Sequence, residues 1–482
     1  MKKKLFVLVL IFLGCLFTTL TYAKVTLPEI ISSNMVLQRN TKVSLWGWAN
    51  AGEKISIRTS WLKETMHVTA ANSGDWKIIL QTTNSKKPQS AWINSNKQTI
   101  ALTNILFGEV WLCSGQSNME IPISGYMGQP VYGAQEAIAD AANDNIRLFT
   151  VSNQASLTPQ NKLGAYKEWQ SASAASVKDF SGVAYFFGKH LQEVLGVPVG
   201  LIHSSWGGSL IEAWMSKESL GAIKHFDLNN VDLKRGNRFP TVLFNAMIHP
   251  LIPYTIKGAI WYQGEANISQ PKLYKLLFPA MVSDWRARWG IGDFPFYYVQ
   301  IAPFAYSKQN RMDDPDNAAF LREAQLQCLD IIPNSGMAVT LDIGTEHIIH
   351  PTDKKDVADR LLYNALNKTY GYKAIDYAGP MYDSMYNKND GIYITFKNAE
   401  KGLYAFNKLD GFEIAGADKV FYPAEATIYQ RKEVFVKSDK VINPVAVRYC
   451  WRSWTVGTLF DNFLLPASSF RTDNWDDAKQ SE

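Results

Sequence analysis

The 482-residue sequence predicts an α/β protein: a parallel β-sheet with helices on both faces, flanked on each side by a β-rich module. Three observations predict this fold. In residues 106–375, short apolar runs typical of buried strands alternate with helical segments. Before and after this block, short segments alternate apolar and polar residues, as antiparallel strands do. Hydrophobic residues make up 46% of the chain and charged residues 19%, which excludes an intrinsically disordered protein.

The chain begins with a segment typical of a secretory signal peptide. Three lysines at positions 2–4 precede an apolar run over residues 5–20, and small residues lead to a cleavage position after Ala23. The run is shorter than the roughly 20 apolar residues that span a bilayer. We therefore expect residues 1–23 to be removed on export to the periplasm or medium, leaving no stable membrane span. Lipoprotein anchoring through Cys15 is a weaker alternative.

The charge of the mature chain argues against a nucleic-acid partner. Removing the three lysines of the signal segment lowers the formal net charge from +5 to +2. The three remaining cysteines match no zinc-site spacing, and we expect them to be buried and chemically inert: Cys113, Cys328 and Cys450. We expect neither a metal nor any other cofactor.

The first β-rich module, residues 24–105, is predicted to be a β-sandwich. Its strand-like segments are 42–48, 54–58, 76–80 and 99–102. Trp46 and Trp48 fit equally well as core residues or as a platform for a ligand. The last module, residues 376–482, returns to β patterning, with strand-like segments at 391–396, 426–429, 433–436 and 445–451.

The middle block, residues 106–375, is predicted to be the catalytic domain. Its expected strands are 107–113, 197–203, 256–262, 296–300 and 336–341, and its expected helices are 184–195, 273–289 and 353–366. Functional sites of such sheets lie in the loops at the carboxyl ends of the strands. Candidate residues are therefore sought where each strand ends.

Ser117 follows the first of these strands, after a turn that contains Gly115. A serine on such a turn presents its hydroxyl and its own N–H to the crevice, which is what a nucleophile with an oxyanion donor requires. A serine that caps a helix, worth about 1 kcal/mol, fits the position equally well.

Two further strands end in loops with possible oxyanion donors. Gly207 and Gly208 follow the strand that ends near Ser205, and glycines let backbone N–H groups approach a ligand closely, although an ordinary tight turn would look the same. Gln263 follows the next strand, and its amide could donate to a developing oxyanion. Glu265 is better interpreted as a structural ion-pair partner.

A fourth strand leads into a segment with two acids and two histidines. Asp342, Glu346, His347 and His350 lie within nine residues, and Pro351 then opens a helix. A histidine held in this way is suited to general-base work near neutral pH. A metal site is disfavoured, because no further histidine or cysteine lies nearby in the sequence.

Taken together, these segments resemble the SGNH (GDSL-like) hydrolases, and closely their sialate O-acetylesterase-like branch. The resemblance covers essentially the whole mature chain and implies a three-layer α/β/α domain. It is carried by residues 113–119, 205–208, 211–214, 244–248, 261–265, 349–351 with Lys354, and 465–472.

The resemblance implies a serine esterase that acts on acetylated carbohydrate. Ser117 would be the nucleophile and His350 its base, while the N–H of Ser117, an N–H at Gly207 and the side chain of Gln263 would form the oxyanion hole. The acyl group would pass through an acetyl-enzyme, and the substrate would be an O-acetylated sialic acid or an acetylated polysaccharide such as xylan.

One departure from the family pattern concerns the acid that orients the histidine. The usual positions, two or three residues before it, hold Ile348 and His347. Glu346 is favoured slightly over Asp342 as a replacement, and a Ser–His dyad is the alternative. A catalytically weak or inactive carbohydrate-binding protein on an esterase scaffold is a second interpretation, against which the intact Ser117, Gly207, Gln263 and His350 argue. The oligomeric state stays open.

Overall fold

The computed structural model of the chain describes residues 24–96, 98–223, 225–226, 231–314, 317–388 and 391–480. The predicted signal peptide, residues 1–23, and the acylation candidate Cys15 lie outside the described residues. In the described part of the chain, no helix combines the length and the apolar character needed to cross a bilayer.

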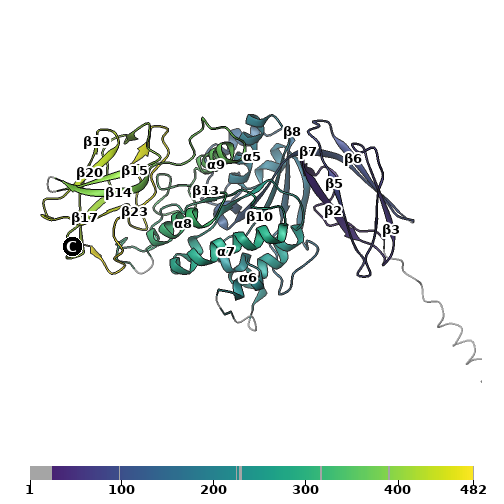
Figure 1. The fold of residues 1–482 in the computed structure, drawn as a ribbon, viewed down its shortest axis with the longest axis horizontal. Helices are drawn as coiled ribbons and strands as arrows, with labels where there is room; N and C mark the ends of the chain where they lie inside the picture. The colour runs from purple at the N-terminus through teal and green to yellow at the C-terminus, as the bar shows by residue number, and fades with distance from the viewer. Residues whose placement is uncertain are drawn as a thin grey trace, which may run out of the picture.

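A central sheet organises the middle of the molecule (Figure 1). Its strand order is β13-β12-β11-β7-β10-β8-β9, with bounds Ser335–Ala338, Phe296–Val299, Gly258–Tyr262, Thr99–Gly115, Val199–Ser205, Asn143–Val151 and Tyr166–Ala172. Neighbours from β13 to β8 pair in parallel, as predicted. The sheet is nevertheless mixed, because the edge strand β9, which the sequence analysis did not predict, runs antiparallel to β8. A loop without a crossover helix joins these two strands, and such a connection returns the chain antiparallel.

Helices cover both faces of this sheet. Figure 1 shows α5 (Gly182–Leu195) and α9 (Lys354–Asn364) on one side, and α7 (Pro271–Trp289) and α8 (Ala319–Ile331) on the other. Side chains of successive strand residues point to opposite faces, so Trp111 packs with the α5 and α9 layer while Leu112 packs with the α7 layer. The predicted strands and helices are therefore present in this block, but β8, β9 and α8 were not predicted. The block also contains the short helices α3 (Ala134–Ala139), α4 (Ala174–Lys178) and α6 (Lys217–Gly221).

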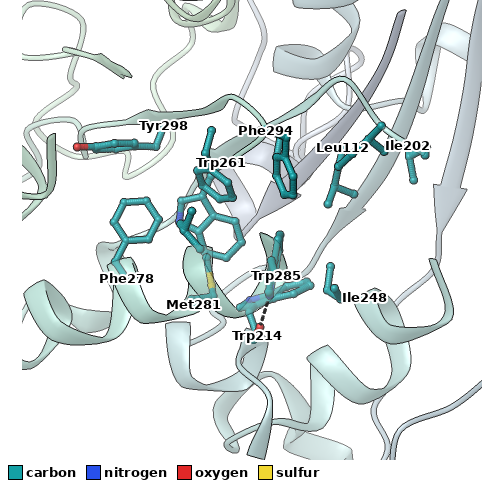
Figure 2. Close-up of a cluster of buried hydrophobic side chains, with 14 of the residues drawn as sticks. Leu112, Ile202, Trp214, Ile248, Trp261, Phe278, Met281, Trp285, Phe294 and Tyr298 are labelled. Carbon is teal, nitrogen blue, oxygen red and sulfur yellow. Dashed lines mark hydrogen bonds between the residues drawn. The ribbon is translucent and has the colours of Figure 1, made fainter. Parts of the chain in front are cut away.

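Aromatic side chains fill the space between the sheet and α7 (Figure 2). Trp261 of β11 contacts Trp285 of α7 edge-to-face with ring centroids 5.8 Å apart, and Trp214 in the same way at 6.0 Å. The indole N–H of Trp285 donates to the carbonyl oxygen of Trp214 at 3.0 Å. Each of these rings is fully buried, and large aromatic side chains dominate core energetics. This packing holds β11, whose carboxyl end carries Gln263.

The main helices begin and end at residues that the sequence marks. The Ser181 hydroxyl accepts from the N–H of Ala184 at the start of α5, and Gly196 ends that helix in a left-handed conformation. The Asp353 carboxylate caps α9 by accepting from the N–H of Asp356 at 2.9 Å. Capping of α9 fixes where the preceding segment, with His350, meets the sheet.

The N-terminal module shares a strand with the central sheet. Strand β7 runs unbroken from Thr99 to Gly115, pairing first with β6 and then with β10 and β11. It therefore crosses the position expected for the boundary between the first two domains. Trp46 lies in the core, edge-on to Tyr254. The remaining strands of the module are β1 (Val36–Gln38), β2 (Lys42–Trp48), β3 (Lys54–Thr59), β4 (Met66–Thr69), β5 (Asp75–Gln81) and β6 (Gln89–Asn94).

The C-terminal module forms two sheets and a short strand pair at the opposite end of the molecule (Figure 1). Buried Arg322 of α8 donates to the carbonyl oxygen of Cys450 at 3.2 Å and to the hydroxyl of Ser469 at 3.1 Å. Gly457 also donates its N–H to the carbonyl oxygen of Leu341 at 2.9 Å, so this module supports the segment that leads to His350. The strands are β14 (Met381–Lys388), β15 (Gly391–Lys397), β16 (Leu403–Tyr404), β17 (Phe412–Ala415), β18 (Val420–Pro423), β19 (Glu425–Tyr429), β20 (Glu433–Lys437), β21 (Ala446–Tyr449), β22 (Phe460–Asp461), β23 (Phe470–Arg471) and β24 (Lys479–Gln480).

Candidate active site

Three of the predicted motifs meet at one edge of the central sheet. Gly115 at the end of β7 pairs with Ser205 at the end of β10 and with Tyr262 at the end of β11. The strands are parallel, so the loops that follow them emerge side by side. These loops carry Ser117, Gly207 and Gln263, as the strand-end argument predicts.

Gly115 makes the turn that presents the nucleophile candidate. Its φ of +139° is a conformation that favours glycine, and a Cβ there would lie 2.1 Å from the carbonyl oxygen of Tyr262. The chain then enters the short helix α2 (Ser117–Glu120), with Gln116 at the N-cap position. The alternative interpretation of Ser117 as a helix cap is therefore wrong, because Ser117 is the first helical residue.

Ser117 and His350 lie within hydrogen-bond distance although 233 positions separate them in the sequence. The Nε2 atom of His350 is 2.7 Å from the Oγ atom of Ser117. Burial of the ring, assisted by the nearby positive charge of Lys354, lowers the pKa of His350 to about 4. The ring is therefore neutral at pH 7, the form in which Nε2 can accept the serine proton.

The other ring nitrogen of His350 does not meet a carboxylate. Its Nδ1 atom forms a hydrogen bond with Oε1 of Gln129. An amide oxygen can only accept, so Nδ1 carries the proton and Nε2 faces Ser117 without one. Gln129 thus occupies the place where a serine hydrolase usually has an acid.

Neither predicted acid reaches His350. Asp342 accepts from both terminal nitrogens of Arg360 at 2.7 Å, because the buried guanidinium requires a charged partner. Glu346 is half exposed, and its carboxylate lies 3.7 Å from Nε2 of His347. The prediction that one of these acids orients the histidine is therefore not supported by the geometry.

Gln129 sits on a compact loop, residues 122–133, between α2 and α3. Tyr126 and Gln129 exchange two backbone hydrogen bonds at 2.9 and 3.0 Å, and the Tyr126 ring lies edge-on to His350 at 6.2 Å. Tyr132 donates its N–H to the carbonyl oxygen of Thr352 at 2.9 Å, which ties the loop to the histidine segment. Sequence reasoning missed this loop, because a lone glutamine has no recognisable spacing to a catalytic residue. The three glycines of the loop were the one feature of its sequence that could have indicated a functional role.

Gly207 lies directly beside Ser117, as predicted for an oxyanion donor. A Cβ on Gly207 would lie 2.8 Å from Oε2 of Glu120 and 3.3 Å from the Cβ of Ser117, so a larger residue would crowd both side chains. The N–H of Gly207 donates to Oε2 of Glu120 at 2.6 Å, and Asn153 donates to the other oxygen at 2.8 Å. Glu120, which sequence reasoning also missed, therefore occupies the donor in this arrangement.

The Gln263 side chain forms a hydrogen bond to the loop that carries Gly207. Its Nε2 group donates to the carbonyl oxygen of Ser209 at 3.0 Å and to Oδ1 of Asn267 at 2.7 Å. Both amide hydrogens are thereby engaged, while Oε1 is buried without a partner among the described residues. The structure brings Gln263 to the site, and a role as a direct oxyanion donor would require it to release one of these bonds.

Two buried ionisable side chains, Lys354 and Glu265, contact Asn118, the residue that follows Ser117. Lys354 is completely buried, and its Nζ donates to Oδ1 of Asn118 at 2.5 Å. The Nδ2 of Asn118 donates in turn to Oε1 of the buried Glu265 at 2.5 Å. Burial lowers the pKa of Lys354 to about 7 and raises the pKa of Glu265.

The cysteines take no part in this site. Cys113, Cys328 and Cys450 are all free and buried, and burial raises the pKa of each thiol. Across the residues that the structure describes, no group of three or more histidine, cysteine, aspartate or glutamate side chains is arranged to hold a metal ion.

Comparisons with known proteins show the family to which this chain is similar. Residues 107–358 match the family described as carbohydrate esterase, sialic acid-specific acetylesterase. The sialate O-acetylesterases of Pongo abelii and Homo sapiens are each 31% identical to the chain over 464 residues, covering 88% of this chain and 87% of theirs. A carbohydrate acetylesterase from Xanthomonas citri, known from its crystal structure, is 36% identical, with a TM-score of 0.86 over 94% of this chain and 100% of that one.

Proposed function

The chain belongs to the sialic acid-specific acetylesterase family of carbohydrate esterases and is a carboxylic ester hydrolase, and from this premise we propose that it removes acetyl groups from sugar hydroxyls through a serine-bound acetyl-enzyme. The observation that carries the mechanism is the 2.7 Å separation between Ser117 Oγ and His350 Nε2. The same geometry argues against an inactive carbohydrate-binding protein, because a sugar-binding surface has no need for this pair.

The reaction proceeds in two steps. His350 Nε2 takes the Ser117 proton as Oγ attacks the ester carbonyl, and the same nitrogen then protonates the departing sugar oxygen. A water molecule repeats the sequence on the acetyl-enzyme and releases acetate. Gln129 holds the proton on Nδ1 throughout, so that Nε2 remains the reacting nitrogen.

Backbone N–H groups stabilise the negative charge that develops on the carbonyl oxygen. Gly207 lies against Ser117, and its N–H together with that of Ser117 can face an oxyanion there. In the resting arrangement Glu120 accepts the N–H of Gly207, so this carboxylate moves aside when the acyl group binds. Gln263 fixes the loop through Ser209.

A sugar that bears a carboxylate, such as a sialic acid, fits the rim of the site best. Arg238 is exposed, and its Nη2 atom would lie 3.9 Å from a Cβ built on Gly208, the residue after the oxyanion donor. A guanidinium in this position can hold a carboxylate in a bidentate manner. Neutral acetylated xylan would gain nothing from it.

The direct test measures acetate released from O-acetylated sialic acid and from acetylated xylo-oligosaccharides. We expect turnover by the wild-type protein and its loss in Ser117→Ala and His350→Ala, while Ser124→Ala, an exposed serine nearby, stays active. Arg238→Gln should reduce turnover of the sialic acid ester and spare the xylo-oligosaccharide. Glycan binding by the wild type with no acetate release from either substrate would instead identify a binding protein.

We also propose that the protein is exported and that its mature chain has three parts. Residues 1–23 are removed during secretion, and the mature enzyme carries an SGNH-hydrolase domain, residues 106–375, between the modules 24–105 and 376–482. The basic and apolar pattern of the first segment supports export. N-terminal sequencing of protein recovered from the periplasm or medium should begin at Lys24, and a lipid-modified Cys15 at the terminus would contradict cleavage after Ala23.

A further inference from the structure

Asn118 links the segment that bears the nucleophile to the segment that bears the histidine. It follows Ser117 directly, and its Nδ2 donates both to Glu265 Oε1 at 2.5 Å and to the carbonyl oxygen of Ile349 at 3.2 Å. Ile349 is the residue before His350. The side chain of Asn118 therefore makes a direct bond between the two halves of the serine–histidine pair.

Lys354 and Glu265 complete this arrangement from two other elements. Lys354 opens α9 and donates to Asn118 Oδ1 at 2.5 Å, while Glu265 begins the short 3-10 helix (Glu265–Asn267) that follows β11. Asn118 and Lys354 have no exposed surface, and Glu265 is 6% exposed. Burying charged groups costs desolvation free energy that their mutual attraction often fails to offset, so fold stability alone does not explain why Lys354 and Glu265 are placed here.

We propose that Lys354, Asn118 and Glu265 form a positioning network, which holds the His350 segment against the nucleophile turn and sets the electrostatic environment of His350. The inference rests on the proposed function in taking Ser117 and His350 as the reacting pair. None of the three side chains contacts Ser117 Oγ or a ring nitrogen of His350 in the structure. Their effect is therefore transmitted through the backbone of residues 117–118 and 349–350 and through charge.

The charges around the network decide its effect on His350. Glu265 and Asp353 attract the Lys354 ammonium, and the ring of Tyr262 lies 5.8 Å from it. Tyr262, Tyr274 and Tyr306 also interact with Glu265, and burial raises the pKa of all three hydroxyls. At pH values below 7 Lys354 is protonated, and a second positive charge on His350 is disfavoured.

The first experiment compares Lys354→Met with Lys355→Met, a matched control on the next residue of the same helix, whose partly exposed side chain pairs with Asp359. In Lys354→Met we expect kcat to fall about tenfold, as for the loss of one charge-assisted hydrogen bond. The acid limb of the pH profile of kcat/KM should also move to higher pH, because the cation that disfavours protonation of His350 is gone. In Lys355→Met both properties should match the wild type. An acid limb in Lys354→Met at the wild-type pH would overturn the inference, since a purely structural lysine would lower kcat without moving it.

A second variant covers the case in which Lys354→Met does not fold. The double variant Glu265→Gln with Lys354→Met removes both buried charges and keeps an amide oxygen for Asn118. Titration of the ¹⁵N-labelled His350 ring by NMR then gives its pKa directly, without any turnover. A raised His350 pKa supports the network and an unchanged one refutes it, whether or not the protein hydrolyses esters. Loss of ester hydrolysis in Ser117→Ala tests the proposed function separately.

Discussion

Replacing Gln129 tests how His350 is oriented when no acid is present. In the wild type, the Gln129 amide oxygen accepts from Nδ1 of His350, and the loop that carries it is tied to the histidine segment through Tyr132. Gln129→Ala removes the acceptor and leaves the backbone of this loop intact. Gln129→Glu keeps the acceptor and adds a negative charge.

The size of the two effects follows from the kind of hydrogen bond. A hydrogen bond between neutral groups contributes about 0.5–1.5 kcal/mol, so Gln129→Ala should lower kcat by about two- to thirteenfold. This is far less than the roughly 10⁴-fold loss that follows replacement of an orienting aspartate in a serine protease. In Gln129→Glu the bond becomes charge-assisted and about twice as strong, and the carboxylate favours the protonated ring. The pKa of His350 should then rise from about 4.

The assay is the pH dependence of kcat/KM for p-nitrophenyl acetate between pH 3.5 and 8, at constant ionic strength. In the wild type we expect the acid limb near pH 4, because His350 must be neutral to accept the proton. The limb should move upward in Gln129→Glu and stay in place in Gln129→Ala, whose plateau is lower. Equal plateaus for Gln129→Ala and the wild type would refute the orienting role. A loss near 10⁴-fold would mean that Gln129 contributes more than a neutral hydrogen bond.

Three further predictions concern neighbouring features and use four variants. Asp342→Asn leaves buried Arg360 without its charged partner, so the free energy of unfolding in urea should fall by about 3 kcal/mol or more. Neither Asp342→Asn nor Glu346→Ala should move the acid limb of the pH profile. A shifted acid limb in either variant would identify that acid as the orienting group. Glu120→Gln removes the negative charge beside Gly207 N–H, so kcat/KM for the small neutral ester should rise, whereas a fall would show that this carboxylate assists the reaction. The third concerns His203, whose pKa burial lowers to about 4. The unfolded chain, with an ordinary histidine pKa near 6.5, binds more protons in this interval, so stability should fall as the pH drops from 6.5 to 4, by about 2–3 kcal/mol from this residue. Urea unfolding at both pH values should show a smaller decrease in His203→Gln, and an equal decrease would mean that His203 is not the residue responsible.

The edge of the sheet that carries the site was predictable, because the carboxyl ends of parallel strands lie at the same edge. Apolar runs marked β7, β10 and β11, and parallel pairing of these strands dictates that Ser117, Gly207 and Gln263 emerge together. His350 was predictable from its place before a helix. Strands β8 and β9 were not recognised, since their apolar positions are interrupted by polar residues and β9 lies on the sheet edge.

The partners of the catalytic pair were not predictable, because they depend on contacts between loops. Gln129 reaches His350 across 221 positions, and Glu120 reaches Gly207 across 87. Glu346 was the first candidate for the orienting acid because it is nearest to His350 in the sequence, and Asp342 was the second because it lies at the end of a strand. The Asp342 carboxylate instead forms an ion pair with Arg360 on α9, because a buried guanidinium is stable only with an anionic partner. Sequence distance cannot rank such competing partners.

The Gln129 amide, which stands in place of an acid, and the buried Lys354 both affect the acid–base properties of His350. The hydrogen-bond partner of Nδ1 is a neutral amide, and Lys354 disfavours the protonated ring, so His350 is a weak base and its protonated form is a strong acid. A weak base limits the attack of Ser117 on an unreactive carbonyl such as an amide. A strong acid assists the departure of a poorly stabilised alkoxide, which is the leaving group when an acetyl ester of a sugar hydroxyl is cleaved. The same ring stays neutral and competent at mildly acidic pH, where a histidine paired with a carboxylate would already be protonated. An amide at the orienting position is therefore compatible with ester cleavage and is not by itself a sign of a decayed enzyme.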